Sequence, residues 1–330
     1  MELSGEKVLI TGAGGFIGSH LVEVLLKKGC NVRAFIKYSS SGNIGNLKWL
    51  KNNTNNLTVI YGDVRDYDSV FQAMKGCSIV FHLAALISIP YSYSNPVGFF
   101  KTNVLGTLNV LETARKLRIE RILHTSTSEV YGTAQYVPMD EKHPTIAQSP
   151  YSASKIAADK ASESYFLSYN VPVVIVRPFN TFGPRQSTRA FIPSVIVQAL
   201  TKDEIKMGDL TPTRDLTYVI DTVEGFIALA IAEEDVLGKT FNLGTGQEHI
   251  VGDVAKKILS LTNPKGRIVT ESSRIRPKKS EVRRLCSNPE KIWKYTNWKC
   301  KYSFDEGIEK TIHWFKNNKQ ILAEFYSNLI

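Results

Sequence analysis

The chain has 330 residues, of which 43% are apolar and 22% charged, and this ordinary globular composition argues against intrinsic disorder. Its four cysteines show no C-x-x-C spacing and its six histidines are scattered, so the sequence predicts neither a metal site nor a disulfide framework. No apolar run approaches the roughly 18 residues of a spanning helix, and "MELSGEKVLITG" lacks the basic start of a signal peptide. We therefore expect a cytoplasmic protein with no membrane partner.

The net charge of +10 is unevenly distributed along the chain. Residues 265–301 hold twelve Lys or Arg residues and only three acids. Such basic stretches are more often solvated faces than nucleic-acid sites, and a small anionic substrate needs only one or two of these charges. We expect no nucleic-acid partner.

Short apolar runs alternate with helical stretches through the first half of the chain. Strands are expected at residues 7–11, 31–38, 57–64, 78–85, 121–128 and 171–179. This alternation predicts parallel βαβ units. The expected fold class is α/β: a Rossmann-like doubly wound parallel sheet, with a smaller mixed α/β C-terminal substrate lobe.

The pattern loosens after about residue 180, where turn-rich stretches precede the basic region. We expect residues 1–178 to form an NAD(P)-binding Rossmann domain and residues 179–330 to form mainly a substrate-binding lobe. Segments near 215–247 are expected to return to the first domain, because "YVIDTVEGFIALAI" and "TFNLGTG" have the apolar character of its elements.

A glycine-rich turn follows the first expected strand and opens a helical pattern. Gly12, Gly15 and Gly18 form G-x-x-G-x-x-G in "GAGGFIGSHLVEVLLKKG". Glycines permit a tight turn and let backbone N–H groups approach a pyrophosphate, which the helix dipole also favours. In this strand-turn-helix context the motif predicts a dinucleotide site rather than a merely structural turn.

Cofactor choice is expected to depend on the end of the second strand, where NAD enzymes usually place an acid. Here the sequence is "VRAFIKYSSSG", and the first acid after it is Asp63. Arg33, Lys37, Ser39 and Ser40 offer donors to a 2′-phosphate. NADP is therefore the predicted cofactor and NAD stays possible, since Arg33 and Lys37 could instead point to solvent.

Tyr151 and Lys155 lie four residues apart in "SPYSASKIAAD", where Ser149 is the expected N-cap and Pro150 the first helical residue. They therefore share one helical face. A neighbouring ammonium and an oxidised nicotinamide both favour a phenolate, so we expect a pKa of Tyr151 lowered by about two to three units. That change makes the tyrosine a base near neutral pH. The alternative is an ordinary amphipathic helix with a surface lysine.

Several motifs occur together and in order. They are "TGAGGFIG", "HLAA", "TNVLGTLNVLE", "STSEVYG", "PYSASK", "RPFNTFGPRQ", "TRDLTYVIDT" and "FNLGTG". With them the chain resembles the extended short-chain dehydrogenase/reductase superfamily, in its nucleotide-sugar epimerase/dehydratase branch, over most of its length. "HTSTSEVYGTAQYVPMDEKHP" and "SPYSASKIAADK" most resemble sugar-nucleotide 4,6-dehydratases, especially those acting on N-acetylglucosamine nucleotides in nonulosonic acid pathways.

The resemblance implies a role for each catalytic candidate. Tyr151 takes the 4-hydroxyl proton while hydride leaves C4, Thr127 hydrogen-bonds the same oxygen, and Lys155 holds Tyr151 and the nicotinamide ribose. Glu129 removes the C5 proton as the 6-hydroxyl leaves as water, and hydride returns to C6. Ser128 departs from the glucose-nucleotide pattern, in which an Asp protonates the leaving oxygen, but matches the GDP-mannose pattern. Protonation could come from Glu129, or from a water held by Ser128, or a 5,6-ene could be released.

Further residues complete the expected site. "LISIPYSYS", with Ser88, is expected to line the sugar pocket. The resemblance places diphosphate and base contacts at Asn180, Arg189, Arg214 and Arg276. Cofactor contacts are expected from Gly12, Gly15, Phe16, Ile17, Gly18, Arg33, Lys37, Ser39, Asp63, Val64, Leu83, Ala84, Ala85, Asn103, Tyr151 and Lys155.

Two rival functions share most of these residues. A nucleotide-hexose 4-epimerase needs the same cofactor site, Thr127, Tyr151 and Lys155, but no C5 base, so Glu129 argues against it. A non-catalytic NADP-sensing scaffold would not need an intact Tyr151 and Lys155 pair. The expected partner is a nucleotide-sugar substrate, with uracil or guanine as its base, and the protein is expected to be a homodimer.

Overall fold

The main sheet of the computed structural model, which describes residues 2–50, 54–318 and 320–321, has seven strands in the order β10-β6-β5-β4-β1-β2-β3. Every pairing in this sheet is parallel. The strands are β1 (Lys7–Thr11), β2 (Asn31–Lys37), β3 (Leu57–Gly62), β4 (Ile79–His82), β5 (Arg121–Thr125), β6 (Val173–Pro178) and β10 (Thr240–Leu243). The expected Rossmann-like parallel sheet is confirmed.

Helices cover both faces of the main sheet, because side chains alternate along each strand. Val8 and Ile10 of β1 belong to a core that α1 (Phe16–Lys27) and α8 (Val219–Ile231) complete. Leu9, between them, belongs to the opposite core with α2 (Tyr67–Met74) and α5 (Gly106–Leu117). Each fully buried aliphatic side chain of this kind contributes about 1.5–3 kcal/mol relative to an exposed one.

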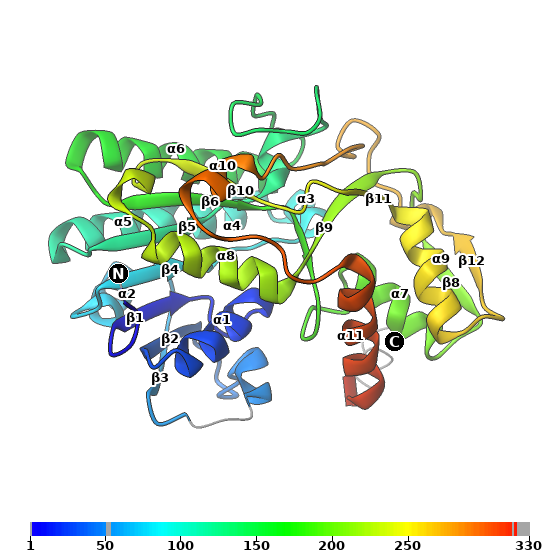
Figure 1. Ribbon diagram of the computed structural model, residues 1–330, viewed down its shortest axis with the longest axis horizontal. Coiled ribbons are helices and arrows are strands. Elements are labelled where there is room, and N and C mark those ends of the chain that lie inside the picture. Colours follow the sequence, from blue (N-terminus) through cyan, green and yellow to red (C-terminus); the bar gives the residue numbers. More distant parts are fainter. Residues whose placement is uncertain (1, 51–53, 319, 322–330) are drawn as a thin grey trace.

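A small lobe packs beside the main sheet, at the right of Figure 1. Its core joins elements of two short sheets with three helices. One sheet holds β7 (Asn180–Phe182), β9 (Thr213–Tyr218) and β11 (Glu248–Ile250), and the other holds β8 (Glu204–Met207) and β12 (Arg267–Thr270). The helices are α7 (Phe191–Ala199), α9 (Val251–Thr262) and α11 (Phe304–Asn317).

The remaining elements connect these layers or border the sheet. They are α3 (Ile89–Ser94), α4 (Pro96–Phe100), a π-helical turn η2 (Lys101–Leu105), α6 (Pro150–Tyr169), α10 (Glu290–Tyr295) and the 3₁₀ turns η1 (Gly45–Trp49), η3 (Ser128–Tyr131), η4 (Glu234–Val236) and η5 (Ser272–Arg274). None of the helices in the described part of the chain is both long and apolar enough to span a membrane.

Local sequence explains two element boundaries that matter for function. Ser149 caps α6 by accepting the amide of Ser152, and Pro150 follows at the first helical position, as expected. Strand β5 ends at Thr125 rather than continuing to residue 128, because the Thr127 hydroxyl accepts the Glu129 amide and starts η3. The residues after Thr125 are thus free to enter a site.

Candidate active site

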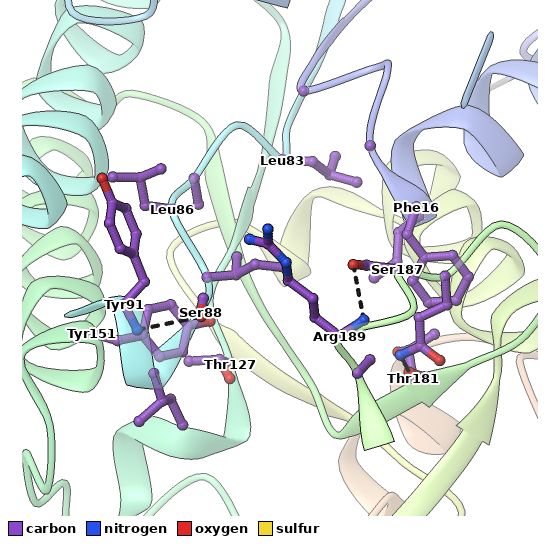
Figure 2. Close-up of a pocket in the computed structure, with 18 of the residues that line it drawn as sticks. Phe16, Leu83, Leu86, Ser88, Tyr91, Thr127, Tyr151, Thr181, Ser187 and Arg189 are labelled. Carbon is purple, nitrogen blue, oxygen red and sulfur yellow. Dashed lines mark hydrogen bonds between the residues drawn. The ribbon is translucent and has the colours of Figure 1, made fainter. Parts of the chain in front are cut away.

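A cavity of about 1310 Å³ lies at the carboxyl ends of β1, β4 and β5, between the main sheet and the small lobe. This is the switch point of the strand order, where doubly wound sheets bind ligands. Figure 2 shows Tyr151, Thr127 and Ser88 on one side of it and Phe16 on the other. The cavity therefore offers one set of possible ligand contacts on each of its two sides.

Most residues expected from the sequence line this one cavity. They are Gly12, Gly15, Phe16, Ile17, Gly18, Lys37, Ser39, Asp63, Val64, Leu83, Ala84, Ala85, Ser88, Thr127, Ser128, Glu129, Tyr151, Lys155, Asn180, Arg189, Arg214 and Arg276. Arg33 and Asn103 were also expected as ligand contacts, and they do not line it.

The glycine turn is shaped for close approach of a ligand. Gly12 has φ +71°, and a Cβ there would lie 2.8 Å from the Ala84 nitrogen. A Cβ at Gly18 would collide with the carbonyl oxygen of Gly12. Gly15 begins α1 without any side-chain cap, so the first amides of the helix stay open to an anion. These features fit the pyrophosphate of a dinucleotide.

The end of β2 contributes Lys37 and Ser39 to the cavity, but Arg33 points elsewhere. The Arg33 guanidinium donates to the carbonyls of Ala73 (2.9 Å) and Lys75 (2.7 Å), at the end of α2. Arg33 lies four residues before the carboxyl end of the strand, about 13 Å away, and there it caps the free carbonyls of a helix. The expectation of a cofactor contact from Arg33 is wrong for this reason.

Asn103 supports the cavity wall from behind. Its carboxamide accepts the Leu86 amide (2.8 Å) and donates to the Leu86 carbonyl (3.0 Å) and to Ser154 Oγ (2.9 Å). It therefore joins the loop after β4, whose residues Leu83 and Ala84 line the cavity, to α6. The side chain is fully used by these bonds, which explains why it does not reach a ligand.

The catalytic candidates come from two elements. Thr127, Ser128 and Glu129 follow β5, and Tyr151 and Lys155 lie on the first turns of α6. All five side chains are buried, yet they line the cavity. The Lys155 ammonium donates to the Thr125 carbonyl at 2.5 Å. The structure thus places residues of "STSEVYG" and of "PYSASK" at the same cavity, as expected.

Burial dominates the titration of this pair. It lowers the pKa of Lys155 to about 8, and the charge of Asp159 opposes that change. Burial also raises the pKa of Tyr151, as do Glu129 and Asp159, while a hydrogen bond with Thr127 lowers it. In the protein alone the pKa of Tyr151 is thus raised, because the phenol is almost completely removed from water, which sequence spacing does not reveal. The expected lowering includes the charge of an oxidised nicotinamide, so it stays a prediction for the cofactor-bound protein.

Sequence reasoning missed a buried polar cluster next to these residues. Asp159 Oδ2 accepts from Ser126 Oγ (2.8 Å) and from Arg177 Nε (3.1 Å) and Nη2 (2.9 Å). Asp159 Oδ1 lies 3.3 Å from His124 Nε2. The only signal in the sequence is that Asp159 falls one helical turn after Lys155. Ser126, which stands in the hydroxyl run "STS", thus lines the cavity and also binds Asp159 behind it.

Two arginines of the cavity lining share one acid. Arg214 Nη2 and Arg276 Nη1 both approach the same oxygen of Glu281, at 3.2 and 3.6 Å. Figure 2 shows the Arg189 side chain reaching into the space between Leu83 and Ser88. Glu281 was not expected from the sequence, since a single acid in a basic stretch has no distinguishing pattern. The cluster presents two guanidinium groups to an anionic ligand.

Comparison with known proteins agrees with this geometry. The family described as GDP-mannose 4,6 dehydratase matches residues 9–311. A human dTDP-D-glucose 4,6-dehydratase is 32% identical over 95% of this chain and 91% of its own length. A UDP-glucose 4-epimerase of Mycolicibacterium smegmatis is 31% identical over 95% of this chain and 100% of its own.

A solved structure extends the likeness to the cofactor side. DesIV, a dTDP-glucose 4,6-dehydratase of Streptomyces venezuelae solved with NAD bound, has a TM-score of 0.85 and 26% identity, covering 95% of this chain and 98% of that one. The fold and site are those of an enzyme that works on nucleotide sugars with a nicotinamide cofactor. The chain belongs to the GDP-mannose 4,6 dehydratase family, within the extended short-chain dehydrogenase/reductases that act as nucleotide-sugar dehydratases and epimerases.

Gly18→Ala tests the glycine turn. The added methyl group would meet the Gly12 carbonyl, which is backbone and cannot rotate away, so the turn or α1 must shift. We expect NAD and NADP to bind at least about tenfold more weakly, or about 1.4 kcal/mol, by calorimetric titration. Gly76→Ala is the control: its added methyl group meets no atom within 4 Å, and the backbone strain that alanine brings at φ +76° falls outside the cavity lining. Unchanged affinity in Gly18→Ala would contradict the assigned pyrophosphate site.

Proposed function

We propose that the chain is a nucleotide-sugar 4,6-dehydratase. Its substrate is UDP- or GDP-N-acetylglucosamine, converted to the 4-keto-6-deoxy sugar for nonulosonic acid or surface glycan biosynthesis. The observation that carries this proposal is the buried carboxylate of Glu129 in the same cavity as Thr127, Tyr151 and Lys155. An oxidation at C4 needs the last three groups, whereas only elimination of water also needs a base for C5.

Each side chain has one task in the proposed reaction. Tyr151 accepts the 4-hydroxyl proton, Thr127 hydrogen-bonds the same oxygen, and Lys155 stabilises the phenolate. A bound nicotinamide would supply the acceptor for the C4 hydride and its donor to C6, and C5 would take up a proton as that hydride arrives. The 4-ketone acidifies the C5 proton, which Glu129 removes as the 6-hydroxyl leaves as water. Because burial raises the pKa of Tyr151, its deprotonation depends on nearby positive charge.

The leaving 6-oxygen needs a proton, and Ser128 cannot supply it as a carboxylic acid would. Ser128 lies buried in the cavity wall beside Glu129. Glu129 can return the proton that it takes from C5, or a water held by Ser128 can pass it on. If hydride return is slow, a 5,6-ene sugar nucleotide is released instead, which is the first alternative product.

A nucleotide-hexose 4-epimerase is the second candidate, favoured by the 31% identical relative that bears this name. It would use Thr127, Tyr151 and Lys155 in the same way and leave Glu129 without a chemical role. A non-enzymatic NADP-sensing scaffold would leave Thr127, Glu129, Tyr151 and Lys155 without a chemical role.

For the cofactor we propose NADP, with NAD as the alternative. Lys37 and Ser39 line the cavity at the end of β2, and this strand end carries no acid. The acid at the end of β3, Asp63, is engaged by Arg65, whose Nη2 lies 2.6 Å from its Oδ2. The 2′-phosphate of NADP would thus meet donors rather than a free carboxylate. The DesIV structure contains NAD, and this supports NAD as the alternative cofactor.

We also propose that the protein is a cytoplasmic homodimer. Val97, Phe100 and Leu105 are 63%, 42% and 44% exposed on the continuous helical segment of α4, η2 and α5. Their spacing places them along one side of the helix. An apolar stripe of this kind on an otherwise polar surface is typical of an interface. A second copy of the same helices would cover it.

The reaction itself is tested with purified protein and both nucleotide sugars. UDP- and GDP-N-acetylglucosamine are incubated separately with NADP or NAD, and the products are analysed by mass spectrometry and NMR. The proposal predicts loss of one water and a new C6 methyl group. Loss of water without a methyl group indicates the 5,6-ene, and inversion at C4 without loss of water indicates the epimerase.

Glu129→Gln separates oxidation from elimination. We expect this variant to reduce the cofactor, since that step depends on Thr127, Tyr151 and Lys155, and then to stall. Removal of a positioned general base lowers the rate of water loss by roughly 10²- to 10⁴-fold. Absorbance of reduced nicotinamide should accumulate together with a 4-keto sugar that keeps its 6-hydroxyl. Tyr151→Phe is the matched control and should reduce no cofactor. Dehydration by Glu129→Gln at the wild-type rate would refute the assignment of Glu129 as the C5 base.

Lys37→Asp tests the cofactor preference. An aspartate at the end of β2 would accept hydrogen bonds from a ribose hydroxyl and repel a 2′-phosphate, so the preference should shift from NADP toward NAD. Affinities of the protein for both cofactors are compared by titration. Lys7→Asp, with the same change of charge at the amino end of β1, serves as the control. A wild type that already prefers NAD tenfold would show that the β2 end was misinterpreted.

Arg276→Ala tests the anionic subsite. Loss of a guanidinium that contacts the diphosphate should weaken substrate binding by about 2–4 kcal/mol, measured as a higher KM, with cofactor affinity unchanged. Lys278→Ala removes a charge from the exposed part of the same segment and should have no such effect. If the KM of Arg276→Ala equals that of the wild type, Arg276 belongs to the solvated basic face.

A further inference from the structure

The buried cluster around Asp159 has no assigned part in the chemistry. Asp159, Arg177 and His124 are buried and do not line the cavity. They nevertheless come from α6, β6 and β5, and two of these elements, α6 and β5, hold or directly precede the catalytic candidates. The Arg177 guanidinium also donates to the Tyr131 hydroxyl (3.0 Å), which in turn donates to Asn242 Oδ1 (2.7 Å). Asp159 is therefore the only acid directly bonded to this arginine among the described residues.

Ser126 connects this cluster to the catalytic pair. Its hydroxyl donates to Asp159 Oδ2 at 2.8 Å, and its amide donates to the Val176 carbonyl at 2.7 Å. The residue before it, Thr125, supplies the carbonyl that binds the Lys155 ammonium. The residue after it, Thr127, supplies the hydroxyl that interacts with Tyr151. A shift of Ser126 would thus move a partner of each catalytic side chain.

The position of Asp159 on α6 adds an electrostatic link. Tyr151, Lys155 and Asp159 are spaced by four residues, so they follow one another along the same side of the helix. Across the described residues no carboxylate is hydrogen-bonded to Lys155, and its ammonium donates instead to a neutral carbonyl. In a dry site an ammonium is unfavourable unless a negative charge lies nearby.

We propose that Asp159 is a positioning residue for the Tyr151 and Lys155 pair: its carboxylate fixes Ser126, and its negative charge favours the ammonium form of Lys155. This inference rests on the proposed function, in which Tyr151 and Lys155 oxidise the sugar at C4. The run "STS" then has two separate uses. Thr127 faces the substrate, and Ser126 anchors the end of β5 to α6.

The direction of the electrostatic effect follows from the groups that face one another. The charge of Asp159 raises the pKa of both Lys155 and Tyr151. Arg177 stays charged, and burial lowers the pKa of His124, so that ring is neutral near pH 7. Removal of the Asp159 charge should therefore lower both catalytic pKa values. Activity needs an ionised tyrosine and a protonated lysine, so both limbs of its pH profile should move to lower pH.

Asp159→Asn is the test, because the amide keeps the shape of the side chain. Its oxygen can accept from Ser126 and Arg177, and its NH₂ can face His124. The rate of cofactor reduction is measured against pH in single turnovers, with whichever of the two nucleotide sugars the wild type dehydrates. We expect both limbs to move to lower pH by about one unit, which is the size of pKa shift that one nearby charge causes at a buried site. Melting temperatures are recorded in parallel.

Ser126→Ala is the matched variant, since it removes the tether and keeps the charge. We expect the rate of cofactor reduction to fall roughly fivefold, which corresponds to about 1 kcal/mol from one lost hydrogen bond. The pH profile of this rate should keep its position. This variant leaves no charge unpaired, so it decides the anchoring role if Asp159→Asn does not fold. A wild-type rate in Ser126→Ala, or an Asp159→Asn profile with unmoved limbs, would overturn the inference.

A measurement without substrate separates this inference from the proposed function. The Cε resonances of ¹³C-labelled lysines are titrated by NMR in the free protein, and Lys155 is assigned by its loss in Lys155→Met. We expect Lys155 to titrate at lower pH in Asp159→Asn than in the wild type. Equal titration in both proteins would refute the electrostatic role. A wild type that reduces no cofactor with any nucleotide sugar would instead refute the proposed function and leave this titration valid.

Discussion

The parallel pairing of the main sheet is the constraint on which the whole site depends. Parallel strands end at the same edge, so the segments that follow β1, β2, β4 and β5 must meet there. The first supplies the glycine turn, the second Lys37, the third the Leu83–Ala85 wall, and the last Thr127 and Glu129. These four segments lie far apart along the chain. Their shared edge converts four separate motifs into one cavity that can hold a cofactor beside a sugar.

The elements next to this edge are held in place by buried polar contacts rather than by apolar packing alone. Asp159 joins α6 to β5 and β6 through Ser126 and Arg177, and Asn103 joins the loop after β4 to α6. A buried charge is tolerated only when partners satisfy it, so each of these contacts specifies one arrangement of its neighbours. Tyr151 and Lys155, the proposed catalytic pair, lie at the start of α6, and the same contacts hold this helix against the strand that precedes Thr127.

The relatives of this chain include both dehydratases and epimerases. Oxidation at C4 makes a ketone, and what happens next depends on which group can reach C5. In this chain Glu129 lines the same cavity as the groups proposed to perform the oxidation. Burial lowers the pKa of Arg214, and the charge of Glu129 opposes that change, so the proposed C5 base and a proposed substrate-binding arginine act on each other within one cavity.

The sequence by itself determined the fold class, the glycine turn and the position of Tyr151 and Lys155 one turn apart on the same helix, because these depend on spacing along one strand or helix. It also determined the family, through motifs in a specific order. Only the tertiary structure decided that Arg33 caps α2, that Ser126 serves Asp159 and that Glu281 lies between two arginines, since each depends on which distant element lies opposite. The raised pKa of Tyr151 belongs to the same group, because burial is a property of the packed chain and not of the residues that flank the tyrosine.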